Sequence, residues 1–334
     1  MTKTRKILLA VFAVIILALL ASYIAATDFS LMASYMAEAP SLIPLLLLAS
    51  LLGHLSGTAA WRLVLGEEAA KVSLSELFFI RLICENLTVF NPTNIIAGDG
   101  LKGIFLSKKQ IDNDANVGSI LLSRVLLIVT AILLMVLSMV YLLLTAANSM
   151  PSLAIPTLIL MSITLMVGLM YLLLHKDMYL HRLATRLQST AVGRWLPDSR
   201  IEQIAAINAS LCSFYRGHKV RLVVAFLLSA FHWVCGAAEF YLILTFFDIP
   251  ISALDALVIE MGVMGFKAAG SMIPGQLGVE EYGNKVMLNI AGILGNEIWL
   301  IVSLLRRGRQ VFWLLVTAPA SMILYKKYKV TNAT

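Results

Sequence analysis

The sequence has few charged residues for its length. Charged residues make up 13% of the 334 residues, about half of the roughly 25% that is usual in soluble proteins. Hydrophobic residues reach 60%, so the chain has too little polar surface to cover a water-soluble globule. These proportions exclude a cytosolic enzyme and a disordered protein, and they predict an integral membrane protein.

Cysteines and familiar catalytic motifs are also scarce. The three cysteines are Cys84, Cys212 and Cys235, and they form no CxxC motif. An odd number without such spacing excludes a disulfide scaffold and predicts no metal knuckle. The HExxH, GxSxG, P-loop and DxDxDG patterns do not occur either. We therefore expect no cofactor, no metal site and no enzymatic activity.

Six apolar runs are long enough to cross a membrane, because about 20 helical residues span the hydrocarbon layer. The first run is longer than the apolar part of a signal peptide, so we interpret it as a retained helix. The predicted spans are 7–26, 42–65, 117–145, 153–174, 222–247 and 298–325.

The distribution of Lys and Arg predicts the orientation of these spans. Basic residues occur in the N-terminal tail, between residues 62 and 109, throughout 175–221 and in the C-terminal tail, whereas the loops at 27–41, 146–152 and 248–256 have none. This bias predicts a multi-pass protein of the inner (cytoplasmic) cell membrane with both termini cytoplasmic. Segment 176–219 is predicted to be a cytoplasmic amphipathic stretch on anionic lipid. The net charge of +7 follows from the same bias, so nucleic acid is not an expected partner.

Two apolar segments are interrupted. Segment 73–109 breaks at Asn91-Pro92-Thr93-Asn94, and segment 252–296 breaks between Gly270 and Gly278. Each segment has both flanks on one predicted side, so each should enter the membrane and return. Broken backbone at membrane depth is tolerated where protein buries it or water lines it, and paired breaks in two halves point to a transporter site.

The two breaks occupy corresponding places in two halves of the chain. Residues 42–145 and 222–325 each contain a span, a broken hairpin and a long span with arginine near its start. The hairpins open to opposite sides, which predicts an inverted repeat. The predicted fold is one all-α polytopic membrane domain over 1–334, with six transmembrane helices and two re-entrant hairpins. We expect the hairpin tips and the arginines to form a single polar cavity.

Charged side chains at membrane depth need a partner or a function, because each costs about 2.5–3.5 kcal/mol there. Arginine presents a planar fork that matches phosphate. A buried hydrogen-bond pair is expected between His232 and Glu239, seven residues apart. The predicted substrate-binding residues are Arg81, Glu85, Asn91, Pro92, Asp99, Lys102, Arg124, Lys267, Pro274, Gly275, Gly278, Glu280, Glu281, Arg306 and Arg307.

Short motifs around these residues resemble those of the lysylphosphatidylglycerol synthase transmembrane (flippase-like) family. The second break, Pro274-Gly275-Gln276-Leu277-Gly278-Val279-Glu280-Glu281, is similar to the family signature Pro-Gly-Gly-Leu-Gly-Val-x-Glu and departs from it only at Gln276. The first break, Asn91-Pro92 followed by Gly98-Asp99 and Lys102, has the family's charges but not its residue types. A Glu-Arg pair of the family appears here as Ser123-Arg124, which keeps the arginine and departs at Ser123. Trp61-Arg62 and Arg306 or Arg307 are also similar to family positions.

The resemblance implies that the protein moves a lipid and does not synthesise one. Aminoacylating members of the family carry a soluble transferase domain, which we expect this chain to lack because it ends at Thr334. The expected substrate is an anionic or amphipathic membrane lipid: a phospholipid, a hopanoid or a polyprenyl-linked lipid. Removing Arg124 or Arg306 is expected to stop headgroup transfer without unfolding the protein. A homo-oligomer is compatible with the sequence.

Two other functions fit the sequence. One is a membrane enzyme that modifies a lipid-linked substrate, with Asp99, Glu280 or Glu281 as acid or base. The other is a non-transporting accessory protein of a lipid or glycan pathway. The first alternative lacks a visible nucleophile–base pair, and the carboxylates it needs adjoin basic residues.

Overall fold

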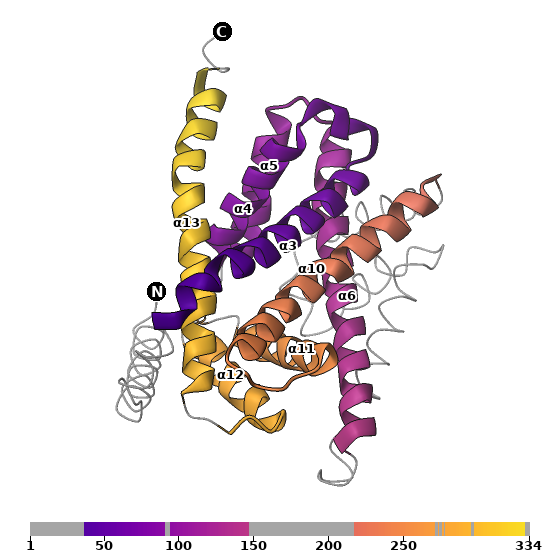
Figure 1. The fold of residues 1–334 in the computed structure, drawn as a ribbon. Coiled ribbons are helices and arrows are strands. Elements are labelled where there is room, and N and C mark those ends of the chain that lie inside the picture. Colours follow the sequence, from indigo (N-terminus) through magenta and orange to yellow (C-terminus); the bar gives the residue numbers. More distant parts are fainter. Residues whose placement is uncertain are drawn as a thin grey trace, which may run out of the picture.

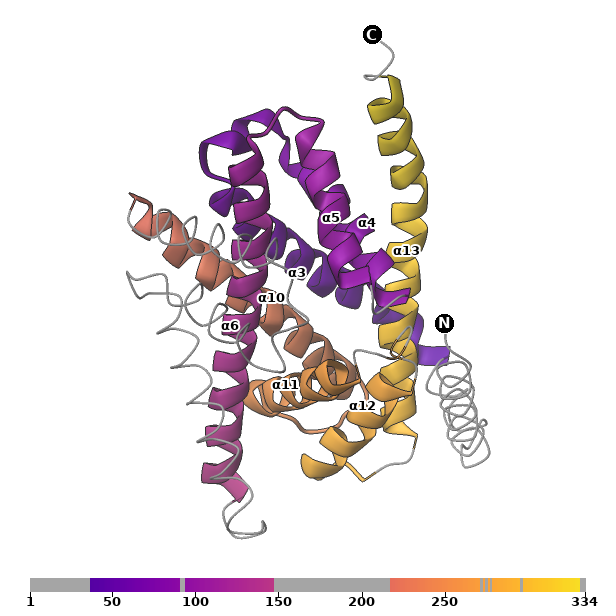
Figure 2. The ribbon, with the colours of Figure 1, turned by 180° about the vertical axis from the view of Figure 1, so that it is seen from behind.

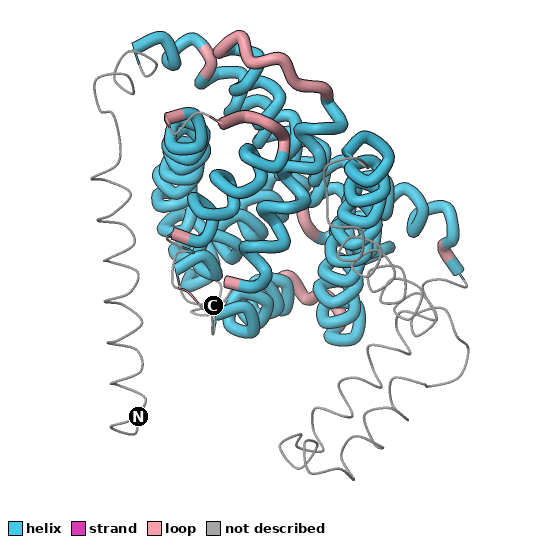
Figure 3. The backbone as a smooth tube through the Cα atoms, turned by 90° about the horizontal axis from the view of Figure 1, so that it is seen from below, coloured by secondary structure: helices cyan, strands magenta, loops and turns pink. Residues whose placement is uncertain are grey.

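The protein is an all-helical membrane protein, as the sequence predicts. The computed structural model describes residues 37–90, 94–146, 217–270, 273, 276, 278–294 and 297–330, and these residues contain no strand (Figure 3). Three described segments are long and apolar enough to cross a membrane: Ala39–Val64, Asn113–Leu142 and Lys219–Phe246. The predicted spans 7–26 and 153–174, and nearly all of segment 176–219, lie outside the described residues. The total of six spans therefore remains a prediction.

The first half of the described chain is a long helix, a helical pair and a second long helix. A 3-10 turn, η1 (Ala39–Ser41), leads into α3 (Ile43–Val64), which has proline near its start. A second 3-10 segment, η2, then leads to α4 (Leu74–Phe90) and α5 (Asn94–Ser107), which pack on each other, and to α6 (Asn113–Ala146). The break between α4 and α5 coincides with the Asn91-Pro92 sequence, because proline has no N–H and disfavours helix in the residue before it.

Segment η2 (Gly66–Lys71) is tied to the loop before α6 by a small polar cluster. The Glu68 carboxylate accepts hydrogen bonds from Lys71 Nζ at 2.7 Å and from the Asp112 N–H at 3.0 Å. These bonds favour the ionised form, so Lys71 first, and then Asp112, hold the pKa of Glu68 below its usual value. The cluster fixes the connection between α3 and α4.

The second half repeats this order. Helix α10 (Lys219–Phe246) is followed by the packed pair α11 (Ala253–Ala269) and α12 (Val279–Ile290), and then by α13 (Ile298–Val330). Ser252 caps α11, since its hydroxyl accepts from the Asp255 N–H at 3.1 Å. Helix α13 has 33 residues, about 50 Å at 1.5 Å per residue. It contains the predicted span 298–325 as one helix.

The two halves pack around α3 and α10, which lie side by side and run in opposite directions (Figures 1 and 2). The α4–α5 pair lies at one end of the molecule and the α11–α12 pair at the other, with α6 and α13 on the flanks. Each half has its own apolar core, one around Trp61, Leu77 and Ile80 and the other around Phe240, Ile259 and Val302. The inverted repeat, and the entry and return of the two helical pairs in the membrane, remain predictions.

Candidate functional site

Five predicted site residues of the first half come together in one group. We call Arg81, Glu85, Asp99, Lys102 and Arg124 the first cluster. Arg81 Nε donates to Glu85 Oε1 at 2.6 Å, as their four-residue spacing on α4 predicts. Arg124 of α6 contacts Asp99 of α5, with Nε 2.9 Å from Oδ2, and Lys102 Nζ lies 3.4 Å from Asp99 Oδ1. These contacts join α5 to α6, and the Arg81–Glu85 pair of α4 lines the same cavity as Lys102 and Arg124.

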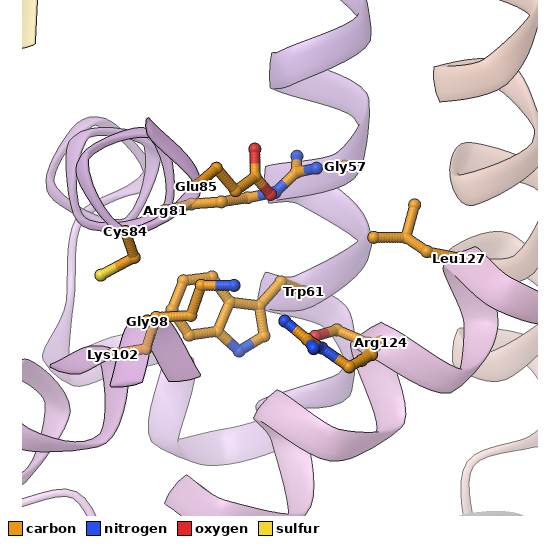
Figure 4. A pocket seen from close by; sticks show the side chains of 10 residues that line it. Gly57, Trp61, Arg81, Cys84, Glu85, Gly98, Lys102, Arg124 and Leu127 are labelled. Carbon is orange, nitrogen blue, oxygen red and sulfur yellow. The ribbon is translucent and has the colours of Figure 1, made fainter. Parts of the chain in front are cut away.

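A small cavity lies within the first cluster. Its volume is about 70 Å³, and its wall includes Arg81, Glu85, Lys102 and Arg124. Figure 4 shows these side chains around a common space beside the Trp61 ring, over which Lys102 Nζ lies at 5.6 Å. Ligand pockets usually measure about 300–1,000 Å³. The cavity in this conformation therefore has room for a few water molecules, and the helices around it must separate to admit anything larger.

The first cluster carries more positive than negative charge. It combines three basic side chains with two carboxylates. Arg81 is only 4% exposed and also donates to the His54 carbonyl at 2.9 Å. Arg124 remains about one-third exposed in its side chain. A net positive cavity among apolar helices attracts an anion strongly, because low-dielectric surroundings screen charge poorly.

The charged residues of the second half form a larger group. We call it the second cluster, and its members come from α10, α11, α12 and α13: Glu239, Glu260, Lys267, Glu280, Glu281, Arg306, Arg307 and Arg309. Arg306 Nη1 lies 2.8 Å from Glu260 Oε2, and its Nε lies 3.6 Å from Glu280 Oε1 and 3.9 Å from Glu239 Oε2. Arg309 pairs with Glu239. Four basic and four acidic side chains therefore neutralise each other.

The break between α11 and α12 is held by the second cluster. Arg307 Nε donates to Glu281 Oε1 at 2.9 Å, and its Nη2 donates to the Gln276 carbonyl at 3.2 Å. The other oxygen of Glu281 accepts the Gly278 N–H at 2.8 Å, which caps α12. Gly278 has φ 79°, a left-handed conformation that glycine adopts at low cost. The predicted site residues Glu281, Arg307 and Gly278 thus organise the turn.

Aromatic side chains lie beside the first cluster. The His54 ring contacts Trp313 and Phe78, with ring centroids at 5.4 and 6.5 Å, and its Nδ1 lies 3.9 Å from Glu85 Oε2. His232 Nδ1 lies 2.7 Å from the Gly53 carbonyl oxygen. The predicted pair of His232 and Glu239 does not form, because Glu239 is engaged by Arg309 and Arg306.

The single polar cavity expected between the hairpin tips stays a prediction, because residues 91–93 and most of 271–277 lie outside the described residues. Among the described residues, the charged side chains form two clusters, and the cavity of about 70 Å³ is lined by residues of the first cluster. Of the predicted site residues, Asn91, Pro92, Pro274 and Gly275 lie outside the described residues. The predicted set omits Glu239, Glu260 and Arg309, which complete the second cluster. The sequence does indicate these three residues as candidates, because each is a charged residue within an apolar stretch.

Glycines on the central helices make room for the buried charges. A Cβ at Gly57 of α3 would lie 2.0 Å from Arg81 Nη1, and one at Gly236 of α10 would lie 2.5 Å from Glu260 Oε1. Arg81 and Glu260 hold the same place in two 17-residue helices, seven residues after Leu74 and Ala253. The halves therefore use the same packing, with a basic residue in one and an acidic residue in the other.

Comparison with known proteins identifies the family of the chain. Among the described residues, no group of three or more His, Cys, Asp or Glu side chains is placed to hold a metal ion. No curated protein and no solved structure matches the chain. The family model of the lysylphosphatidylglycerol synthase TM region matches residues 7–318, which include both clusters and confirm the resemblance seen in the motifs. The chain therefore belongs to the family of the lysylphosphatidylglycerol synthase TM region and is a membrane protein linked to lipid metabolism.

Proposed function

We propose that the protein is a lipid flippase, which moves an anionic lipid between leaflets with the headgroup held by the first cluster. The observation that carries this proposal is the excess positive charge around the cavity, set against a neutral second cluster. Phosphate accepts charge-assisted hydrogen bonds from arginine and lysine. The lipid tails stay in the bilayer, so the protein has to shelter only the headgroup.

The contacts of the first cluster suggest how a headgroup enters. Asp99 holds both Arg124 and Lys102, at 2.9 and 3.4 Å. An arriving phosphate competes with Asp99 for these two cations, which releases α5 from α6. Because the cavity of about 70 Å³ is too small for a ligand of ordinary size, this release also opens the space that the headgroup needs.

The same contacts favour a non-catalytic function. Asp99, Glu280 and Glu281 each lie within 4 Å of basic side chains. A carboxylate that already faces a cation of the protein is poorly placed to exchange a proton with a substrate. We propose that these residues position the cations and do not transfer protons to substrate.

Transport is tested in liposomes with a fluorescent phosphatidylglycerol whose outer-leaflet population is quenched chemically. Replacing Arg124 or Lys102 with glutamine removes one charge-assisted hydrogen bond to the headgroup, which corresponds to about ten- to hundred-fold weaker binding. We expect the wild-type protein to equilibrate the probe and both variants to be much slower. Lys71→Gln is the matched control, because it removes the same charge at an exposed pair and should transport normally.

Two results would contradict the proposal. Wild-type rates in both Arg124→Gln and Lys102→Gln would show that the first cluster does not bind the headgroup. A change in the mass of the probe, measured in the same liposomes, would indicate a lipid-modifying enzyme instead.

A further inference from the structure

A second cleft lies on the other side of α3 from the first cluster. It has a volume of about 500 Å³ and is lined by α3, η2, the start of α4 and the start of α10. Its wall is apolar, with Leu63, Leu74 and Leu228, except for Arg62 and Arg221. The volume falls within the range of about 300–1,000 Å³ that is typical of ligand pockets.

The two arginines of this cleft have no partners among the described residues. Arg62 is in the last turn of α3, and Arg221 is the third residue of α10, so each half contributes one. The nearby carboxylate of Glu68 is already engaged by Lys71 and the Asp112 N–H. Two guanidinium groups that no described residue engages, beside an apolar wall, present positive charge to an external anion.

The cleft is separate from the first cluster. Ala59, Arg62 and Leu63 of α3 line the cleft and follow the spacing of one helical face. Gly57 and Trp61 line the cavity of the first cluster and lie on the opposite face of α3, since a helix turns about 100° per residue. A molecule in the cleft therefore does not occupy the proposed transport cavity.

We propose that this cleft binds an anionic glycerophospholipid of the cytoplasmic leaflet, as a resident lipid that is not transported. The two arginines match a phosphate, and the leucines match the first part of an acyl chain. A free phosphate would leave the apolar wall exposed to water, which favours the whole lipid as occupant. Both α3 and α10 are candidate membrane spans, and the basic flank that contains Arg62 is on the predicted cytoplasmic side, where anionic lipids attract basic residues.

Such a lipid would link the two halves of the protein. Arg62 belongs to the first half and Arg221 to the second, so one phosphate bound by both holds the ends of α3 and α10 together. A ligand that binds only the folded state raises the unfolding temperature, and the stabilisation grows with the logarithm of the ligand concentration relative to Kd. Anionic lipid is thus expected to stabilise the protein independently of transport.

The test uses the full chain with the substitution Arg124→Gln, so that the proposed transport cavity contributes little binding. The protein is placed in phosphatidylcholine nanodiscs that contain increasing amounts of phosphatidylglycerol. Retained lipid is measured by native mass spectrometry, and the unfolding temperature is measured in parallel. We expect one tightly retained phosphatidylglycerol and a rise in the unfolding temperature.

Substitutions in the cleft should remove this binding. Arg62→Gln and Arg221→Gln are each expected to weaken retention about five-fold, because a basic residue contributes about 1 kcal/mol of attraction to anionic lipid. Ala59→Phe fills the cleft without changing charge and should also prevent retention, and it serves as the second variant if the arginine variants fold poorly. Lys219→Gln is the matched control at the exposed start of α10 and should retain the lipid.

Three outcomes would overturn the proposal: equal retention by all variants, equal retention of phosphatidylcholine, or equal stabilisation by inorganic phosphate alone. The last outcome would indicate a phosphate site without a lipid. Because Arg124→Gln is present throughout, loss of cleft binding here and loss of transport in the earlier experiment are separate results.

Discussion

At the scale of single residues, Arg306 and Arg124 differ in what surrounds them. Arg306 is 3% exposed and lies within 4 Å of three carboxylates, those of Glu239, Glu260 and Glu280. Arg124 is about one-third exposed and has one carboxylate partner, Asp99. The structure therefore revises the expectation that either arginine can be removed without loss of stability. It supports that expectation for Arg124 alone.

Replacing Arg306 with glutamine is predicted to destabilise the protein by about 3–5 kcal/mol, because it removes the cation that pairs with the buried Glu260 carboxylate. Thermal unfolding followed by tryptophan fluorescence in detergent would measure the loss. Arg124→Gln is the control and should unfold near the wild-type temperature. The double variant Arg306→Gln/Glu260→Gln also removes the Glu260 carboxylate that has lost its cation, so part of the stability should return. Equal unfolding temperatures for wild type and Arg306→Gln would contradict this prediction.

The sequence predicts local charge pairs better than distant ones. Arg81 and Glu85 are four residues apart on a helix, and their contact follows from that spacing. Glu260 and Arg306 are 46 residues apart, and no periodic pattern connects them. Glu281 was predicted as a substrate ligand, but it caps α12 and holds Arg307. The sequence shows that a charged residue in an apolar stretch needs a partner of opposite charge. Which residue is that partner depends on how the helices pack.

At the scale of helices, the close packing of α3 on α4 depends on a missing side chain. Gly57 faces Arg81 so closely that any Cβ would overlap the guanidinium group. Arg81 also binds Glu85 and the His54 carbonyl. A larger residue at position 57 would therefore force Arg81 away from two hydrogen-bond acceptors.

Gly57→Ala is predicted to cost about 1–3 kcal/mol in stability, as overpacking of a buried site usually does, and to slow lipid transport. The same unfolding and liposome measurements check both effects. Gly308→Ala is the matched control on α13, where a Cβ meets no atom within 4 Å. Alanine is a better helix former than glycine, so Gly308→Ala should leave the stability unchanged or raise it by up to about 1 kcal/mol. A similar loss in both variants would contradict the packing argument.

The breaks in the helices were predictable because their chemistry is local. Proline ends α4 within one residue of the predicted position, and the segment between Gly270 and Gly278 separates α11 from α12. Gly98 and Gly100 remain inside α5. Glycine disfavours a helix only weakly, and the helix-forming residues on both sides outweigh that effect. The way in which the helical pairs pack against α3 and α10 depends on contacts between distant residues and could not be derived in the same way.

At the scale of the whole molecule, the two halves share an architecture but differ in charge. The neutral second cluster joins four helices of its own half, while the first cluster keeps a cavity and an excess of positive charge. Under the proposed flippase function, we expect this difference to give the two halves different parts in transport. The second half would provide a rigid support, and the first half would open and close around the headgroup.

This division requires α4 to move relative to α13 during transport. The two helices are joined by Asn86, whose Nδ2 donates to Thr317 Oγ1 at 2.9 Å. In a background without the three natural cysteines, the pair Asn86→Cys/Thr317→Cys can be joined by a short, membrane-permeant bifunctional thiol reagent. We expect the reagent to reduce lipid transport to the level of protein-free liposomes, because the first half is then fixed to the second.

The matched control joins two residues of the same half. Glu76 and Lys109 contact each other at 2.9 Å across the base of the α4–α5 pair, so Glu76→Cys/Lys109→Cys can be linked without connecting the halves. This link should leave transport intact, and so should the reagent on each single-cysteine variant. If the linked Asn86–Thr317 variant transports at the unlinked rate, the halves do not rock against each other, and the headgroup must pass by motions within the first half alone.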